Sequence, residues 1–318
     1  MRWPIKALAG AAVVVVAVDL FERRVLAGID GASGDDAPAL APWVTEPRWI
    51  DTPDGGQLYC EVRGDGSPIL LLHGHGATLD TFTTLAPRLA AAGHRVIAVD
   101  QRGFGRSSAV PDGFDGFGLI NDVATVLEAL ELQESTVVGH SMGGLVALGL
   151  AIHRPDVTTR VQGLVLLNGI GRGPADNRFN RARVMAMDWP WLEALSRHPR
   201  HGTILTRSNF GTTPRRGDVE AARLVGLDSP IGPRRGFARR LLGTDFTPSL
   251  STVRLPVLAI AGTADRVIPA RESVLLRELL PDARMEILDG AGHMLPMERA
   301  ATVAELIVKF RGELDQRP

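Results

Sequence analysis

The stretch "VVGHSMGGLVALG" (Val137–Gly149) places one serine, Ser141, among glycines directly after a run of apolar residues. A strand that turns sharply into a helix needs small residues around the turn, and a serine there presents its hydroxyl above the sheet edge. The N-terminus of the following helix favours the negative charge that develops when such a hydroxyl attacks. On this stretch alone, Ser141 is either a nucleophile or the N-cap of a helix in a glycine-rich turn.

Apolar runs alternate with amphipathic segments on both sides of this stretch. Residues 48–64 predict a hairpin with its turn at residues 54–56. Strands are predicted at Pro68–Gly74, Arg95–Asp100, Ser135–His140, Val161–Gly169, Pro256–Gly262 and Ala283–Gly290, the first two as continuous apolar runs, and helices at Thr81–Ala92, Phe117–Leu132 and Met142–His153. This alternation predicts a parallel sheet with right-handed crossovers and helices on both faces.

The alternation stops between residues 171 and 250. This segment carries fourteen arginines, no lysine and seven acidic residues, with prolines and glycines between helical patches. We predict an inserted helical cap over the carboxyl edge of the sheet, where open α/β sheets bind ligands. Residues 48–170 and 251–318 are then the core. The arginines are interpreted as a solvated face, or alternatively as a surface attracted to anionic headgroups.

The N-terminal residues 1–27 contain an apolar segment. Arg2 and Lys6 precede twelve uncharged small and apolar residues, Ala7–Val18. That length suits a signal peptide and is shorter than the roughly 20 residues that span a bilayer. We expect a signal or short anchor and a membrane-associated or exported protein, the alternatives being an apolar helix packed on the domain and a cytoplasmic protein. Residues 28–47, rich in Gly, Ala, Pro and Asp, predict a linker.

The composition excludes several classes of site. The chain has 318 residues, of which 45% are apolar, and a formal net charge of −1, which gives no general reason to expect a nucleic acid as partner. Cys60 is the only cysteine, so an internal disulfide and a cysteine metal cluster are ruled out. His73 and His75 lack a third ligand at suitable spacing, and we predict no metal site.

A serine hydroxyl becomes a good nucleophile only when a base takes its proton, and the base is a histidine held by a carboxylate. Asp265, in "AGTADRVIP", follows one predicted strand, and His293, in "LDGAGHMLPME", follows the next. Singly, Asp265 could be a turn residue and His293 a helix cap. Because the carboxyl ends of parallel strands share one edge, we predict that Ser141, Asp265 and His293 form a catalytic triad there.

The oxyanion of the tetrahedral intermediate also needs hydrogen-bond donors. The glycine-rich turn in "LLHGHGA" follows a predicted strand at the same edge. We assign the backbone N–H groups of His75 and Met142 as these donors. The imidazole of His73 is predicted to hold its own loop, and that of His75 to face the pocket.

Together, the motifs "HGHG", "DQRGFGRS", "GHSMGG", "GTADRVIP" and "GAGH" resemble those of the α/β-hydrolase family, in this order, over about residues 48–310. The resemblance implies an eight-stranded, mostly parallel sheet flanked by helices, an inserted helical cap, a Ser-His-acid triad and no cofactor. It also implies a structural loop at "DQRGFGRS", with Asp100 and Arg102 holding the turn. Ser141 argues against the family's epoxide hydrolases and haloalkane dehalogenases, which need a carboxylate at that place.

The substrate is less constrained. The stretch "RVMAMDWPWLEAL" gathers Met185, Met187, Trp189 and Trp191, which line an acyl-chain site or form the core of the cap itself. We predict a serine carboxylesterase or lipase acting on an apolar or lipid-like small-molecule ester. The alternatives are a C–C bond hydrolase, a lactonase, a thioesterase, a cofactor-free haloperoxidase, or a non-catalytic ligand-binding protein on the same scaffold.

Overall fold

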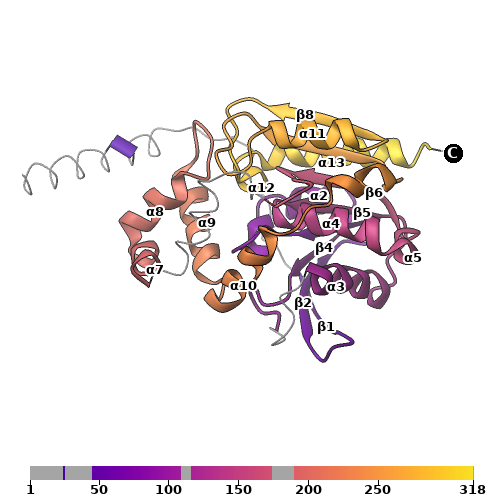
Figure 1. The fold of residues 1–318 in the computed structure, drawn as a ribbon, viewed down its shortest axis with the longest axis horizontal. Coiled ribbons are helices and arrows are strands. Elements are labelled where there is room, and N and C mark those ends of the chain that lie inside the picture. The colour runs from indigo at the N-terminus through magenta and orange to yellow at the C-terminus, as the bar shows by residue number, and fades with distance from the viewer. Residues whose placement is uncertain (1–23, 26–44, 109–115, 174–189, 318) are drawn as a thin grey trace, which may run out of the picture.

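A computed structural model of the chain describes residues 24–25, 45–108, 116–173 and 190–317 (Figure 1). Its strands are β1 (Glu46–Asp51), β2 (Gln57–Arg63), β3 (Pro68–Leu72), β4 (Arg95–Asp100), β5 (Ser135–His140), β6 (Val161–Leu167), β7 (Val257–Gly262) and β8 (Ala283–Leu288). They form one eight-stranded sheet in the order β1-β2-β4-β3-β5-β6-β7-β8. β2 pairs antiparallel with β1 and with β4, whereas β4, β3 and β5 to β8 run parallel. The predicted fold is confirmed.

Helices cover both faces of this sheet. They are α2 (Ala86–Ala91), α3 (Gly116–Ala129), α4 (Met142–His153), α5 (Pro155–Thr158), α11 (Arg271–Leu279), α12 (Leu295–Glu298) and α13 (Ala300–Leu314). Alternate residues of a strand point to opposite faces. In β3, Leu70 and Leu72 accordingly pack with side chains of α3 and α4. Ile69 and Leu71 pack with side chains of α2 and α13. Because helices cover both faces of the sheet, β3 is apolar throughout.

One predicted helix is divided in the structure. The helix predicted over Thr81–Ala92 is a short 3-10 helix, Leu79–Phe82, followed by α2, which has Pro87 in its first turn. Proline lacks an N–H and clashes with the carbonyl four residues earlier, so a helix can begin at Pro87 but cannot run through it. The strand before Ser141 has the predicted extent, since Gly139 and His140 still pair with β6.

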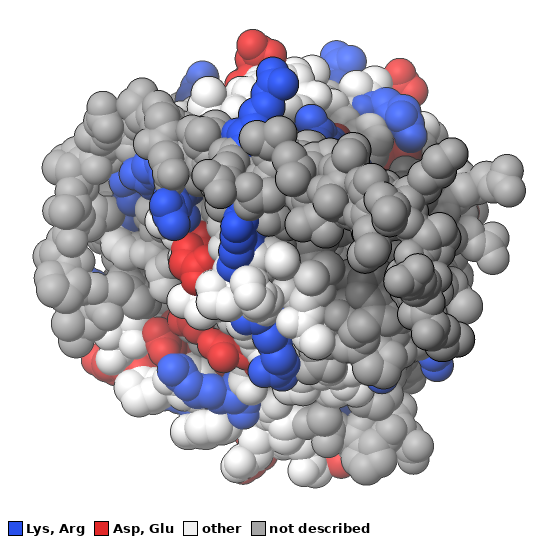
Figure 2. Space-filling model, turned by 90° about the vertical axis from the view of Figure 1, so that its left-hand side faces the viewer, with Lys and Arg blue, Asp and Glu red and all other residues white. Residues whose placement is uncertain are grey.

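Four α-helices lie among the described residues of the segment for which the cap is predicted. They are α7 (Pro190–Arg197), α8 (Pro199–Arg207), α9 (Arg216–Leu227) and α10 (Ile231–Leu241). We call them the cap helices. Figure 1 shows them gathered at one end of the sheet. On their side of the molecule, basic and acidic side chains both appear on the described surface (Figure 2). Phe210, Val219 and Val225 of the cap segment pack with Met294 and Met297 near the sheet's carboxyl edge.

The N-terminal predictions fall largely outside the described residues. Of residues 1–27 the structure describes only Arg24 and Val25, and of the predicted linker 28–47 only the last three residues. β1 begins at Glu46, inside the segment predicted as linker, because Glu46 pairs with Val62 of β2. Among the described residues, no helix is both long and apolar enough to cross a bilayer. The predicted signal or anchor stays a prediction.

Candidate active site

Ser141 lies on the tight turn between β5 and α4. Its backbone has φ 53° and ψ −113°, a strained conformation of the kind that gathers at functional sites. A Cβ on Gly139 would lie 2.3 Å from the carbonyl oxygen of Gly143, and one on Gly143 2.2 Å from that of Leu72. The turn therefore requires both glycines. Ser141 occupies the N-cap position of α4, but its side chain makes no capping hydrogen bond. A capping role does not explain this serine.

Asp265 and His293 follow β7 and β8, as predicted. The His293 Nδ1 lies 2.8 Å from Asp265 Oδ2, and the Asp265 carboxylate is fully buried. The other oxygen, Oδ1, accepts hydrogen bonds from the backbone N–H groups of Val267 (2.7 Å) and Ile268 (2.8 Å). Asp265 is thus a turn residue and a histidine partner at once. These three hydrogen bonds compensate the cost of burying its charge.

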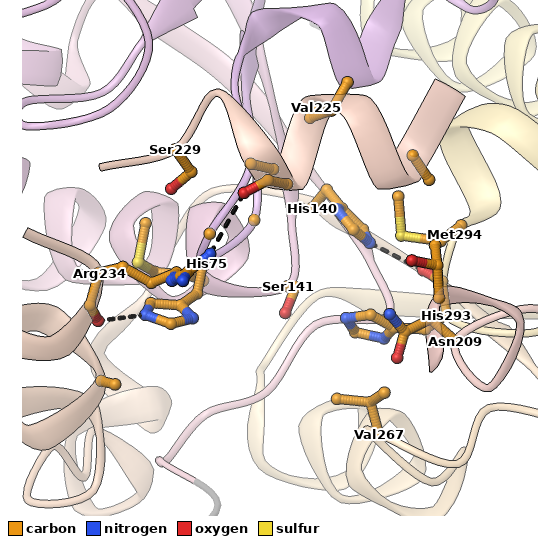
Figure 3. A pocket seen from close by; sticks show the side chains of 18 of the residues that line it. His75, His140, Ser141, Asn209, Val225, Ser229, Arg234, Val267, His293 and Met294 are labelled. Atoms are coloured by element: carbon orange, nitrogen blue, oxygen red, sulfur yellow. Dashed lines mark hydrogen bonds between the residues drawn. The ribbon is translucent and has the colours of Figure 1, made fainter. Parts of the chain in front are cut away.

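This bond fixes which nitrogen of His293 carries the proton. An ionised carboxylate can only accept, so Nδ1 donates, and Nε2 of the neutral ring is left as the acceptor. Figure 3 shows the imidazole of His293 beside the Ser141 side chain, and both residues line the same pocket. The structure therefore brings the three residues of the predicted triad to one edge of the sheet. Such an arrangement can pass a proton from a serine hydroxyl to an imidazole.

The backbone of His293 is anchored on both sides. Its N–H donates to the carbonyl of Asn209 in the cap segment, at 2.7 Å. Its carbonyl accepts from His140 Nε2 (2.8 Å) and from Asn168 Nδ2 (3.0 Å). Burial and the neighbouring imidazole of His293 lower the pKa of His140 to about 3. His140 is therefore neutral at any working pH, with Nε2 as the donor.

Asn168 is a site residue that the sequence reasoning missed. It directly follows β6 with φ 48°, a conformation that asparagine adopts more readily than most residues. Its amide also donates to Gly292 O (2.9 Å) and accepts from Gly262 N (3.0 Å). This buried side chain joins the end of β7 to the loop that carries His293. The sequence signal that could have identified Asn168 is a polar residue directly after an apolar strand, at the same edge of the sheet as Ser141.

The loop after β3 passes close to the serine. A Cβ on Gly74 would lie 3.0 Å from His140 Nδ1 and 3.3 Å from Ser141 Cβ. His75, the next residue, and Met142 both line the pocket beside Ser141. Met142 is the first residue of α4, where an N–H has no carbonyl partner within the helix. Both residues thus belong to the pocket that Ser141 lines, and the role of their amides as oxyanion donors stays a prediction.

The two histidines of this loop have different surroundings. His73 is fully buried, and its Nε2 accepts from Gln101 N at 3.0 Å while its Nδ1 bonds Gly74 O at 2.8 Å. Burial lowers the pKa of His73 to about 4, so this ring is neutral and structural, as predicted. His75 lines the pocket, also as predicted, and its Nε2 donates to the carbonyl of Arg234 on α10 at 2.6 Å.

The "DQRGFGRS" loop is held as the resemblance implies. The Asp100 carboxylate accepts from the backbone N–H groups of Leu79 (2.8 Å) and Arg106 (2.9 Å). Arg102 pairs with the buried Asp122 and with Asp54 in the β1–β2 turn. Because these contacts lie within the loop and its neighbours, the motif supports the fold and supplies no reacting group.

Comparison with known proteins decides the family. The sequence profile described as "alpha/beta hydrolase fold" matches residues 67–300. The chain belongs to the α/β-hydrolase family.

Similar proteins within this family carry different names. The chain is 28% identical to 2-hydroxymuconate semialdehyde hydrolase of Pseudomonas putida, over 80% of this chain and 90% of that protein. It is 28% identical to the non-heme chloroperoxidase CPO-A1 of Kitasatospora aureofaciens, over 77% and 92%. The crystal structure of the esterase RhEst1 from Rhodococcus sp. ECU1013 matches with a TM-score of 0.73 and 26% identity, over 84% and 99%. Membership therefore establishes an α/β hydrolase but not the bond that it cleaves.

The pocket of this α/β hydrolase lies between the cap helices and the loops that carry Ser141 and His293. Its volume is about 310 Å³, within the range of small-molecule sites. Apolar side chains on its wall include those of Ile170, Val225, Val267 and Met294. Of the four residues predicted to bind substrate, Met185, Met187 and Trp189 lie outside the described residues. Trp191 lies in α7, and its side chain is likewise not described.

Glu298 is a second residue that the sequence reasoning missed. Its buried carboxylate accepts from Met294 N (3.0 Å) and from Gly211 N of the cap segment (2.9 Å). Burial raises the pKa of Glu298 above its usual value, while these backbone hydrogen bonds act against that rise.

Among the described residues of this hydrolase, no group of three or more His, Cys, Asp or Glu side chains could hold a metal ion.

Proposed function

We propose that this α/β hydrolase is a serine esterase that cleaves a small-molecule carboxylic ester through an acyl-enzyme on Ser141. One observation carries the proposal: the hydrogen bond from His293 to the buried Asp265 orients the imidazole at the pocket that Ser141 lines. A serine that does not cap its helix, next to an oriented base, is the arrangement that acyl transfer requires.

In the proposed reaction, His293 Nε2 takes the proton of Ser141 while Oγ attacks the ester carbonyl carbon. The carbonyl oxygen becomes an oxyanion that the amides of His75 and Met142 stabilise, each donor contributing about 2.7–4 kcal/mol. His293 then gives its proton to the departing alkoxide, and the alcohol leaves. Water activated by the same imidazole releases the acid and restores Ser141. Asp265 keeps the imidazole in place and stabilises its cation throughout.

The apolar part of the pocket favours a substrate that has an apolar portion. Ile170, Val225 and Val267 offer hydrocarbon surface beside Ser141, and burying each methylene of an acyl chain there contributes about 0.8 kcal/mol. The likeness to the esterase RhEst1 supports ester cleavage.

Labelling with a fluorophosphonate probe tests the nucleophile. We expect the wild type to be labelled and Ser141→Ala to remain unlabelled. Ser208→Ala, which changes an exposed serine of the cap segment, is the matched control and should be labelled normally. Labelling of Ser141→Ala, or none of the wild type, would overturn the assignment. A series of p-nitrophenyl esters of graded chain length then tests ester cleavage, and no turnover across the series would contradict it.

A further inference from the structure

Glu298 places a buried carboxylate against the loop that carries His293. It is the last residue of α12, and only 5% of its surface is exposed. Its Oε1 accepts from the N–H of Met294 at 3.0 Å, and its Oε2 accepts from the N–H of Gly211 at 2.9 Å. The amide of Gly292 also hydrogen-bonds this carboxylate and favours its ionised form. One side chain therefore binds the residues directly before and after His293, and the cap segment as well.

The cap segment and this loop pack backbone against backbone. The His293 N–H donates to the carbonyl of Asn209 at 2.7 Å, and Figure 3 shows the two residues side by side. A Cβ on Gly292 would lie 2.2 Å from the amide nitrogen of Gly211, and one on Gly211 would lie 2.7 Å from that of Gly292. Because side chains are excluded from this contact, the Gly211 amide needs an acceptor from outside it, and Glu298 supplies that acceptor.

Two arginines support the same arrangement. Arg207 of α8 donates to the carbonyl groups directly before and after Gly211, at 3.2 Å and 3.3 Å. Arg299 directly follows Glu298, and its guanidinium donates to the backbone carbonyl of Glu298 at 3.1 Å. Both cations attract a negative charge on the Glu298 carboxylate. They therefore act against the cost of burying that charge.

We propose that Glu298 is a positioning residue for the proposed catalytic base: it fixes the backbone of His293 against the cap segment, so that the imidazole serves both Ser141 and the leaving group. The inference rests on the proposed function, in which His293 first takes a proton and then donates it. An ionised carboxylate has two acceptor oxygens and no donor, so it can bind amides of two segments at once. A misplacement of about 1 Å in an active site can cost about a hundredfold in rate.

Two esters of one acid that differ in the leaving group test the positioning. p-Nitrophenolate leaves without a proton, whereas ethoxide requires one from His293. Displacement of the imidazole should therefore slow the hydrolysis of ethyl butyrate more than that of p-nitrophenyl butyrate. In Glu298→Gln, whose amide has only one acceptor oxygen, we expect the ratio of kcat/KM for the ethyl ester to kcat/KM for the p-nitrophenyl ester to fall about tenfold or more. Both esters are assayed in one preparation, so the fraction of active enzyme cancels, and a purely structural loss leaves the ratio unchanged.

Two further variants complete the test. Glu305→Gln, at an exposed glutamate of α13, is the matched control and should keep the wild-type ratio. Arg207→Met frees the carbonyl groups on both sides of Gly211 without changing the Glu298 side chain, and it should lower the ratio as well. An unchanged ratio in Glu298→Gln would overturn the proposal. If Glu298→Gln does not fold, an unchanged ratio in Arg207→Met would overturn it.

Failure of the esterase proposal gives a different result. If the wild type hydrolyses no ester, ester cleavage is wrong, and the rate constant for labelling of Ser141 by a fluorophosphonate decides the role of Glu298. Labelling that is about tenfold or more slower in Glu298→Gln than in Glu305→Gln would support the positioning of the base, and equal rate constants would overturn it. A wild type that neither hydrolyses esters nor is labelled has no base to position, and this result would overturn both proposals.

Discussion

Replacing Asp265 by asparagine separates the orientation of His293 from the folding of its loop. Asp265 Oδ1 accepts from two backbone N–H groups, those of Val267 and Ile268. In Asp265→Asn only the amide oxygen can accept these bonds, so the oxygen must keep that position. The amide NH2 then faces His293 Nδ1, which has to accept. The proton of the neutral imidazole moves to Nε2, and Nε2 can no longer take the proton of Ser141.

The expected loss follows from this change of tautomer. In a Ser-His-Asp triad, such a substitution lowers kcat by about 10⁴ while leaving the geometry intact, which corresponds to about 5.4 kcal/mol at 1.36 kcal/mol per factor of ten. The free energy of unfolding should change little, because both backbone bonds remain. Asp265→Ala, by contrast, also leaves two N–H groups unpaired, at about 1–3 kcal/mol each where they are buried.

Steady-state hydrolysis of a p-nitrophenyl ester and urea unfolding measure the two effects separately. Asp289→Asn, at an exposed carboxylate in the loop after β8, serves as the matched control and should keep full activity. An Asp265→Asn enzyme that retains more than about a tenth of wild-type kcat would refute the tautomer argument. A large loss of stability in Asp265→Asn would instead show that the amide does not keep its two backbone bonds.

Three further outcomes are expected. Asn168→Ala should lower the free energy of unfolding by about 1–3 kcal/mol and also lower kcat, because it removes a donor to the His293 carbonyl; unfolding and rate measurements check both. Burial raises the pKa of the Cys60 thiol to about 12, so Ellman's reagent at pH 8 should react only after urea unfolds the protein. The hydrogen bond from Arg102 lowers the pKa of Asp54 to about 2, so its stabilisation is present above about pH 4 and is lost as the pH falls through 2. Since the Asp54 side chain is 43% exposed, Asp54→Asn should cost at most about 1 kcal/mol at pH 7, and in urea titrations this difference should vanish towards pH 2.

The strands of the parallel sheet and the candidate site were predictable for the same physical reason. Buried parallel strands are written as short apolar runs, and their carboxyl ends share one edge. Polar residues after β5, β7 and β8 are therefore expected at one place from the sequence alone. The helix predicted over Thr81–Ala92 is divided because Pro87 lies within that segment. A proline within a periodic segment is the stronger signal.

The anchoring residues were not predictable in this way, because their roles exist only between segments far apart in the chain. Asn168 reaches the carbonyl of His293, 125 positions later, and Glu298 reaches the amide of Gly211, 87 positions earlier. Neither belongs to a motif with fixed spacing. A single asparagine after a strand, or a glutamate near a helix end, is much more often a local turn or cap residue.

These same contacts make the cap segment part of the scaffold of His293, the proposed catalytic base. The carbonyl of Asn209 accepts from the His293 amide, and the amide of Thr212 donates to Gly290 O at 2.9 Å. Gly211 packs so closely that a Cβ there would lie 2.0 Å from the same Gly290 oxygen. On the other side of the pocket, α10 bonds the imidazole of His75. Displacing the cap segment would break hydrogen bonds to both loops that flank Ser141, so the position of the cap and the geometry of the site cannot vary independently.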